Sequence, residues 1–250
     1  MIPFKSMQRS FSCSALVLRV RSSGESNREA AFLSAEEGII TATLFGGPKS
    51  ALRAHVSPFN SGTLWIYRDP AKDFRKVSDF DVRSWRPGLR DLYERSSAAS
   101  RIAGILLGSH GGGGPWADVL TLSDGTLDAL EGADEICCER ILFYFLWNWA
   151  ALLGDRGDPG RCTSCACEPA GDGVLWYVPG EGFLCVNCVH REFRGKGLAL
   201  GAGARRWLLA VQNLQPRELV RYGLDAASLG EIRTLITHLE TGNRKYHAGS

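Results

Sequence analysis

The first third of the chain alternates between apolar and polar positions in short runs. Three of these runs, SCSALVLRV from Ser12, GIITATLF from Gly38 and GTLWIY from Gly62, are rich in β-branched and aromatic residues. Polar or glycine-containing stretches such as SSGESN and SAEEG separate them, as turns separate strands. About five short strands in this length predict a small closed barrel, of which the OB-fold is one form, or a small sandwich.

Apolar residues recur at spacings of three and four after Pro87, and this period predicts helices. The first helix covers LRDLYERSSAASRIAGILL, and a weaker pattern follows at 116–132. The run at 136–153 is apolar almost all round and stops before Gly154, which suits a buried helix with a glycine cap. Apolar positions from Leu198 to Leu239 predict that the chain is helical again beyond residue 192.

Positive charge is concentrated towards the N-terminus, although the formal net charge is only +2. Residues 1–110 carry sixteen Lys or Arg against ten Asp or Glu, whereas residues 111–160 carry two against nine. Residues 161–250 carry eleven against eight. This distribution favours a polyanion such as nucleic acid as the partner of the first region, and solvent or a basic partner for the acidic middle.

Export and membrane insertion are not expected. The apolar run Ala15–Leu18 is too short for a secretion signal and is followed by Arg19 and Arg21. The uncharged apolar stretch 141–153 falls short of the ~20 apolar residues that cross a bilayer. We expect a cytoplasmic protein.

A pair of C-x2-C turns, in RCTSCAC and LCVNC, is the strongest local signal. Each such turn presents two sulfurs to one tetrahedral ion. Cytosolic thiols are kept reduced, which disfavours disulfides. The segment 160–190 is therefore predicted to hold a structural Zn²⁺ through Cys162, Cys165, Cys185 and Cys188.

Two nearby side chains, Cys167 and His190, are alternative ligands, and either could replace a member of this quartet. Four sulfurs leave no coordination position for water or substrate, so the predicted site is structural. A zinc-dependent hydrolase or deaminase, which needs an open position, is the less favoured class.

The sequence LFGGPKSALR at 44–53 superficially resembles a phosphate-binding loop. Such a loop needs a glycine directly before its lysine and another five positions earlier. Here Pro48, which has no N–H to offer a phosphate, precedes Lys49, and Ala42 stands where the first glycine would be. An ATP site is not expected, and Lys49 is interpreted as part of a basic turn.

The order of these features resembles the bacterial RecO family of recombination mediators. The resemblance runs from about Ser14 to Leu239 and rests on the order and spacing of ALVLRVRSSGESN, LSAEEGIITATLFGGPKSALR, SPFNSGTLWIYR, FLWNWAALLG and the CTSC and CVNC pair. It implies an α+β protein with an N-terminal OB-fold that binds nucleic acid, expected at 1–82. An all-helical domain with the inserted zinc site is expected at 83–250.

The resemblance also implies a non-enzymatic function in DNA repair. Members of the family bind single-stranded and double-stranded DNA and anneal complementary strands. With RecR and the C-terminal tail of the single-stranded-DNA-binding protein (SSB), they help to load RecA in the RecFOR pathway. Annealing makes and breaks no covalent bond, so it needs no ATP site. A nucleoid-associated location follows from this function.

Basic residues of the barrel are the predicted DNA contacts. Lys49 and Arg53 align with the family's DNA-contacting basic positions. The further candidates in the same domain are Arg19, Arg21, Arg28, Arg68, Lys72, Arg75 and Lys76. Ammonium and guanidinium groups displace counterions from phosphates and need not read bases.

Two questions stay open at this point. The aromatic residues Phe45, Phe59, Trp65 and Tyr67 either stack on bases or belong to the barrel core. The alternative function is that of an OB-fold RNA-binding or structural factor with a structural zinc.

Overall fold

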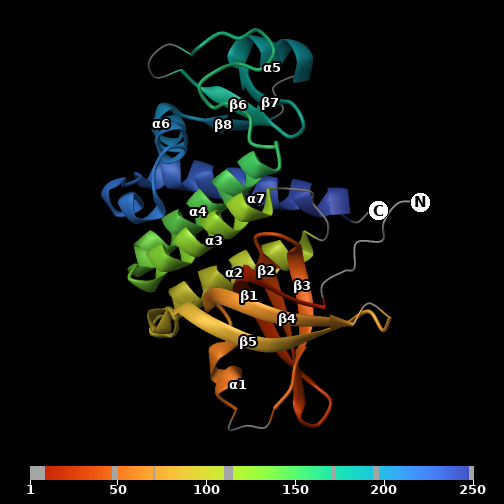
Figure 1. Ribbon diagram of the computed structural model, residues 1–250. Helices are drawn as coiled ribbons and strands as arrows, with labels where there is room; N and C mark the ends of the chain where they lie inside the picture. Colours follow the sequence, from red (N-terminus) through yellow and green to blue (C-terminus); the bar gives the residue numbers. More distant parts are fainter. Residues whose placement is uncertain are drawn as a thin grey trace, which may run out of the picture. The chain divides into compact units, whose positions relative to one another are not determined.

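A computed structural model gives the fold (Figure 1). The structure describes residues 9–46, 50–69, 71–109, 115–169, 173–193 and 197–247. The chain divides into two compact units. The first comprises Met1–Pro87 and Ala99–Asp124, and the second comprises Gly88–Ala98 and Gly125–Ser250.

Five strands of the first unit close into a barrel in the order β1-β2-β3-β5-β4. The strands are β1 (Ser10–Ser23), β2 (Asn27–Ser34), β3 (Gly38–Leu44), β4 (Ser61–Asp69) and β5 (Phe74–Ser84). Only β3 and β5 pair in parallel, and the short helix α1 (Ala51–His55) follows β3. The predicted five-stranded OB-type barrel is confirmed.

The barrel core follows directly from the alternation of residues along the strands. Every second residue of β1 from Cys13 to Val17 is buried in it, and the same holds for β3 from Ile40 to Leu44. Phe32 and Phe80 meet edge to face inside, with ring centroids 6.1 Å apart. Successive strand side chains point to opposite faces, so a period of two fills one interior.

Barrel closure needs a glycine on β4. The pairing of β4 with β5 shifts register between Ser61 and Gly62, because Arg83 of β5 is an extra residue without a partner on β4. A Cβ atom at Gly62 would lie 1.9 Å from the carbonyl oxygen of Asp81. Any side chain there would push the two strands apart.

The remaining elements are mostly helical. They are η1 (Pro87–Arg90), α2 (Tyr93–Gly108), α3 (Trp116–Glu131), α4 (Glu135–Leu152), α5 (Val186–Phe193), α6 (Ala202–Val211), η2 (Pro216–Arg221) and α7 (Ala226–His247). Within the described ranges, no helix combines the length and the apolar character that a membrane span requires.

Helix α4 is the centre of the second unit. Asp134 caps its N-terminus by accepting a hydrogen bond of 2.7 Å from the backbone N–H of Cys137. Eleven of its eighteen residues are buried, among them Trp147, and α7 packs against it. The helix predicted from the apolar run at 136–153 is therefore confirmed.

A three-stranded antiparallel sheet in the second unit was not predicted. It consists of β6 (Leu175–Val178), β7 (Gly182–Cys185) and β8 (Leu198–Leu200) in the order β7-β6-β8. The helical interpretation of the sequence was wrong at Leu198, because residues 198–200 pair with β6. Helix α6 begins only at Ala202. The domain limit at residue 82 stays a prediction.

Candidate nucleic-acid interface and metal centre

Helix α1 carries Arg53, one of the two basic residues of the segment 44–53 that are predicted to contact DNA. The other, Lys49, lies outside the described residues. The Nη2 atom of Arg53 donates a hydrogen bond to the carbonyl oxygen of Ser26, in the turn between β1 and β2. The half-buried Arg53 thus ties α1 to that turn at one end of the barrel (Figure 1).

Strand register brings several predicted cations to one end of the barrel. Residues that pair across neighbouring strands form a continuous row around the barrel. The row consists of Arg21 on β1, Glu29 on β2, Thr43 on β3, Lys76 on β5 and Tyr67 on β4. Lys76 is an exposed member of this row. In the part of the chain that the structure describes, no ion pair of Lys76 is found.

Two further predicted contacts, Arg68 and Arg75, lie directly opposite each other on β4 and β5. Like charges in such positions destabilise a sheet unless another charge balances them. The carboxylate of Glu37 lies 3.2 Å from Arg75, so it balances the charge of Arg75. Arg68 has no ion pair among the described residues, so its positive charge is not neutralised at this end of the barrel.

The other predicted cations differ in how available they are. Arg21 forms an ion pair of 2.6 Å with Glu29. Arg28 is half-buried at the start of β2 and lies opposite Leu44. Arg19 on β1 and Lys72 in the turn after β4 are exposed.

An aromatic pair accompanies the cationic row. The rings of Phe45 and Phe74 are 6.1 Å apart, and the ammonium group of Lys76 lies 6.0 Å from the ring centroid of Phe45. This distance is at the edge of the range for a cation–π contact. Phe45 is 43% exposed, so its face is available to a nucleobase. Sequence reasoning missed Phe74, which reaches Phe45 only because β3 and β5 pair.

The open question about the aromatic residues is answered by their exposure. Trp65, at 38% exposure, lies on the outer surface of β4 together with the half-buried Tyr67, and the half-buried Phe59 lies in the turn before β4. None of these three belongs to the barrel core. The exposed pair Phe45 and Trp65 can therefore offer stacking surfaces.

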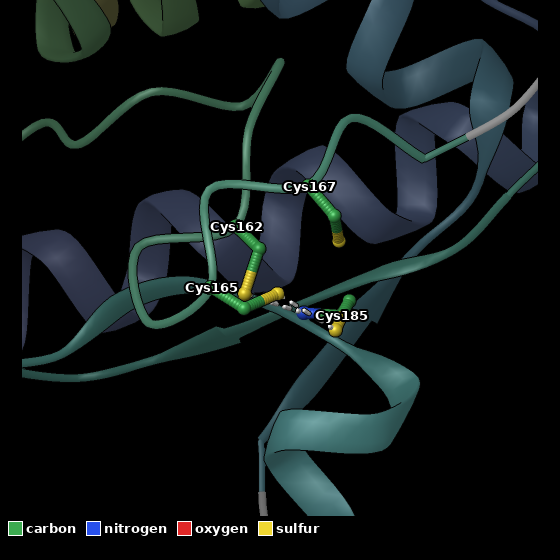
Figure 2. A group of neighbouring side chains, drawn as sticks. All are labelled: Cys162, Cys165, Cys167 and Cys185. Atoms are coloured by element: carbon green, nitrogen blue, oxygen red, sulfur yellow. Dashed lines mark hydrogen bonds between the residues drawn. The ribbon is translucent and has the colours of Figure 1, made fainter.

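The candidate metal centre gathers four sulfurs (Figure 2). The Sγ atoms of Cys162, Cys165, Cys167 and Cys185 all lie within 4.8 Å of one another. The Sγ atoms of Cys165 and Cys185 are 3.7 Å apart. Zinc–sulfur bonds of ~2.3 Å in a tetrahedron place neighbouring sulfurs ~3.8 Å apart, so this donor set can hold a metal ion of that kind.

Backbone hydrogen bonds build the two turns that carry these sulfurs. The N–H of Ala166 donates to the carbonyl of Cys162 at 2.9 Å and closes the first turn. The N–H of Thr163 bonds to the carbonyl of Phe183 at 2.7 Å, which holds this turn against β7. The N–H of Cys185 donates to the Sγ of Cys162 at 3.3 Å (Figure 2) and joins the two turns.

Electrostatics at the second turn favour a thiolate. The backbone N–H of Cys188 donates to the sulfur of Cys185 and lowers the pKa of that thiol to about 6. Because amide hydrogens stabilise the negative sulfur, Cys185 is prepared for a metal before the ion arrives.

The predicted ligand Cys188 is buried on α5 and is not one of the four mutually close sulfurs. Its Sγ atom lies 3.9 Å from the Nη2 atom of Arg191. Its role as a ligand stays a prediction. Cys167, an alternative in the sequence, is brought into the group.

His190 is exposed and lies outside the sulfur group. It stands two residues before Glu192, and His238 stands two before Glu240, as in the H-x-E element of zinc deaminases. Both triplets follow the C-x2-C pairs, whereas the deaminase element precedes them. The exposed His238 hydrogen-bonds the carbonyl of Thr234 in its own helix at 2.8 Å.

Known proteins resemble the chain over most of its length. A family model described as "Recombination protein O N terminal" matches residues 7–84, which include the entire barrel. A protein of Heliobacterium modesticaldum named DNA repair protein RecO is 30% identical over 224 residues, covering 85% of this chain and 77% of the relative. The chain belongs to the RecO family.

Further RecO proteins agree with this assignment. That of Pelotomaculum thermopropionicum is 29% identical over 86% of this chain and 80% of its own length. That of Desulfitobacterium hafniense is 28% identical over 78% of this chain and 67% of its own length. Membership identifies the chain as a DNA repair and recombination protein of a non-enzymatic family.

Proposed function

We propose that this RecO protein is a recombination mediator that binds single-stranded and double-stranded DNA and anneals complementary strands. With RecR, it helps to load RecA onto DNA coated by SSB, whose acidic C-terminal tail it binds. It acts in the cytoplasm, at the nucleoid. Membership of the RecO family supports this proposal, and the arrangement of charges on the barrel adds to it.

The observation that carries the proposal is the exposed Lys76 in the row of paired residues. Its ammonium group lies beside an exposed ring, Phe45, and Arg68 on the neighbouring strand β4 adds a second charge that has no ion pair among the described residues. Cations bind the phosphate backbone without regard to sequence, while an aromatic face stacks on any base. This combination suits strands of any sequence, as annealing requires.

Annealing would then proceed without the making or breaking of a covalent bond. The cations neutralise the phosphates of two strands so that the strands can approach, and base pairing supplies the driving force. Under this proposal the step needs no proton transfer, nucleophile or nucleotide. Its contribution is to lower the repulsion between polyanions.

We further propose that the cysteine cluster holds a structural Zn²⁺. Cys162, Cys165 and Cys185 would be ligands, with Cys188 as the fourth in the arrangement predicted from the two C-x2-C turns. Bound zinc would supply folding energy to a segment whose strands have only three or four residues each.

Binding measured against salt tests the interface. For a single-stranded oligonucleotide, the logarithm of the association constant should fall linearly with the logarithm of salt concentration. Lys76→Ala should reduce the magnitude of this slope by ~0.7, the value expected for one phosphate contact. Fluorescence anisotropy with oligonucleotides of several sequences should show the same loss for each.

Arg217→Ala is the matched control, because Arg217 is an exposed arginine of the second unit. It should leave the slope unchanged. An unchanged slope in Lys76→Ala would remove Lys76 from the interface. Tighter binding of an RNA oligonucleotide at equal salt would instead favour the RNA-binding factor.

A further inference from the structure

Five thiols lie at a site that has room for four ligands. The two C-x2-C turns supply four of them, and Cys167 adds a fifth two residues after Cys165. Zinc in structural sites takes four ligands in a tetrahedron. One thiol must therefore stay outside the coordination sphere at any moment.

Three sulfurs are common to both possible ligand sets. Cys162, Cys165 and Cys185 form a compact group together with Cys167, in which all sulfurs lie within 4.8 Å of one another. Cys188 follows Cys185 in the second C-x2-C turn, the spacing at which both sulfurs of such a turn bind one ion. The fourth position thus has two candidate occupants, Cys167 in the loop and Cys188 on α5.

The backbone holds Cys167 in place irrespective of its side chain. Ala166 has a left-handed conformation with φ of 60°, which turns the chain back towards the site. The carbonyl oxygen of Cys167 then accepts the N–H of Cys162 at 2.9 Å. Cys167 points its sulfur towards that of Cys185 (Figure 2).

Cys188 has a polar partner for a sulfur that is not bound to metal. The Nη2 atom of Arg191 lies 3.9 Å from its Sγ. A thiol or thiolate can remain beside the site on this guanidinium group when another sulfur occupies the fourth position. Cys167, by contrast, is exposed and its free thiol would be solvated.

We propose that Cys162, Cys165 and Cys185 are fixed zinc ligands, whereas Cys167 and Cys188 are alternative occupants of the fourth position. This inference rests on the proposed zinc site. Its consequence is a centre that keeps four thiolates on the ion after one of the two exchangeable thiols is lost or modified.

Serine substitutions with two readouts test the exchange. The variants are Cys167→Ser, Cys188→Ser and the double variant, with Cys165→Ser as a matched control because Cys165 is exposed like Cys167. Zinc affinity is measured by competition with a chelator. Cobalt(II) substitution counts the thiolates, since each cobalt–thiolate bond adds to the charge-transfer absorption.

Each single variant at 167 or 188 should keep one zinc, a four-thiolate cobalt spectrum and an affinity within about tenfold of the wild type. The double variant and Cys165→Ser should show three-thiolate spectra. Their affinity should fall by more than about 100-fold, beyond what loss of an outer-shell partner costs. A three-thiolate spectrum in either exchangeable single variant would overturn the proposal.

Alkylation of the wild type gives a test that does not depend on a variant folding. Iodoacetamide on the zinc-loaded protein should modify Cys167 first and leave the zinc bound, as shown by mass spectrometry and metal analysis. Release of zinc on this single modification would overturn the exchange. If the wild type binds no zinc at all, both the proposed zinc site and this inference fail. If it binds zinc and only the exchange is absent, the zinc site stands.

Discussion

Arg86 is a buried cation whose partners hold the end of β5 in the first unit. Its side chain is 1% exposed. The Nη1 atom donates to the carbonyl of Phe59 at 2.7 Å, and the Nη2 atom lies 2.8 Å from Oδ1 of Asp124. Phe59 has a φ of 73°, and Arg86 satisfies its carbonyl. A guanidinium with its planar fork of donors suits this position, whereas lysine would not reach both partners.

Replacing Arg86 by methionine should lower the free energy of unfolding of the protein by ~3 kcal/mol. The loss leaves the carbonyl of Phe59 without a donor and removes a buried ion-pair partner of Asp124. Urea unfolding measures the change. Arg83→Met is the matched control, because Arg83 pairs with the same carboxylate at 2.8 Å but its side chain is 64% exposed. This control should cost less than ~1 kcal/mol, and equal losses in both variants would contradict the role given to Arg86.

At the scale of elements, helix α7 begins at a carboxylate. Oδ1 of Asp225 accepts the backbone N–H of Ser228 at 2.9 Å, and Oδ2 accepts its hydroxyl at 2.8 Å. These hydrogen bonds to the backbone and hydroxyl of Ser228 lower the pKa of Asp225 below its ordinary value of 3.8. An N-terminal carboxylate also interacts favourably with the helix dipole.

The lowered pKa sets the direction of the pH dependence. The contribution of the charged cap is fully present above pH 3.8 and is lost as the pH falls through the lower folded pKa. Asp225→Asn keeps a capping oxygen but does not titrate. Its free energy of unfolding should therefore fall less steeply than that of the wild type below pH 3.8, as measured by urea unfolding at several pH values. Parallel acid limbs for the two proteins would contradict this account.

Elements with a clear period were predictable from the sequence, and short elements were not. The alternation in β1 and the apolar run of α4 each depend on local residues alone. Strand β8 has three residues and exists only because Leu200 lies opposite Leu175, a contact that no local pattern reveals. Three residues are too few to show the period of a strand, so the sequence pattern around them predicts a helix.

In the candidate sites, too, features set by local residues were predictable from the sequence and features set by distant contacts were not. The two C-x2-C turns predicted a thiolate centre, because sulfur spacing is a local property. That Cys167 joins it depends on the left-handed Ala166, which residue type does not indicate. The hydrogen bond from Arg53 to Ser26 and the contact of Phe74 with Phe45 arise from barrel closure and were equally hidden.

At the scale of the whole molecule, the barrel is the proposed DNA-binding part, and the metal segment is proposed to gain its folding energy from zinc. The barrel is the part that the RecO N-terminal family model matches. Its cations lie on strands whose register is fixed by a filled core. A rigid scaffold with free charges suits a protein that brings two strands together and then releases the duplex.

Annealing of two complementary oligonucleotides without ATP tests this account most directly. The purified, folded protein should accelerate duplex formation at low salt and lose the effect as salt rises. Lys76→Ala combined with Arg68→Ala should slow annealing markedly, while Arg217→Ala should not. Failure of the folded, zinc-loaded wild type to anneal at low salt, or undiminished annealing by the double variant, would contradict the account.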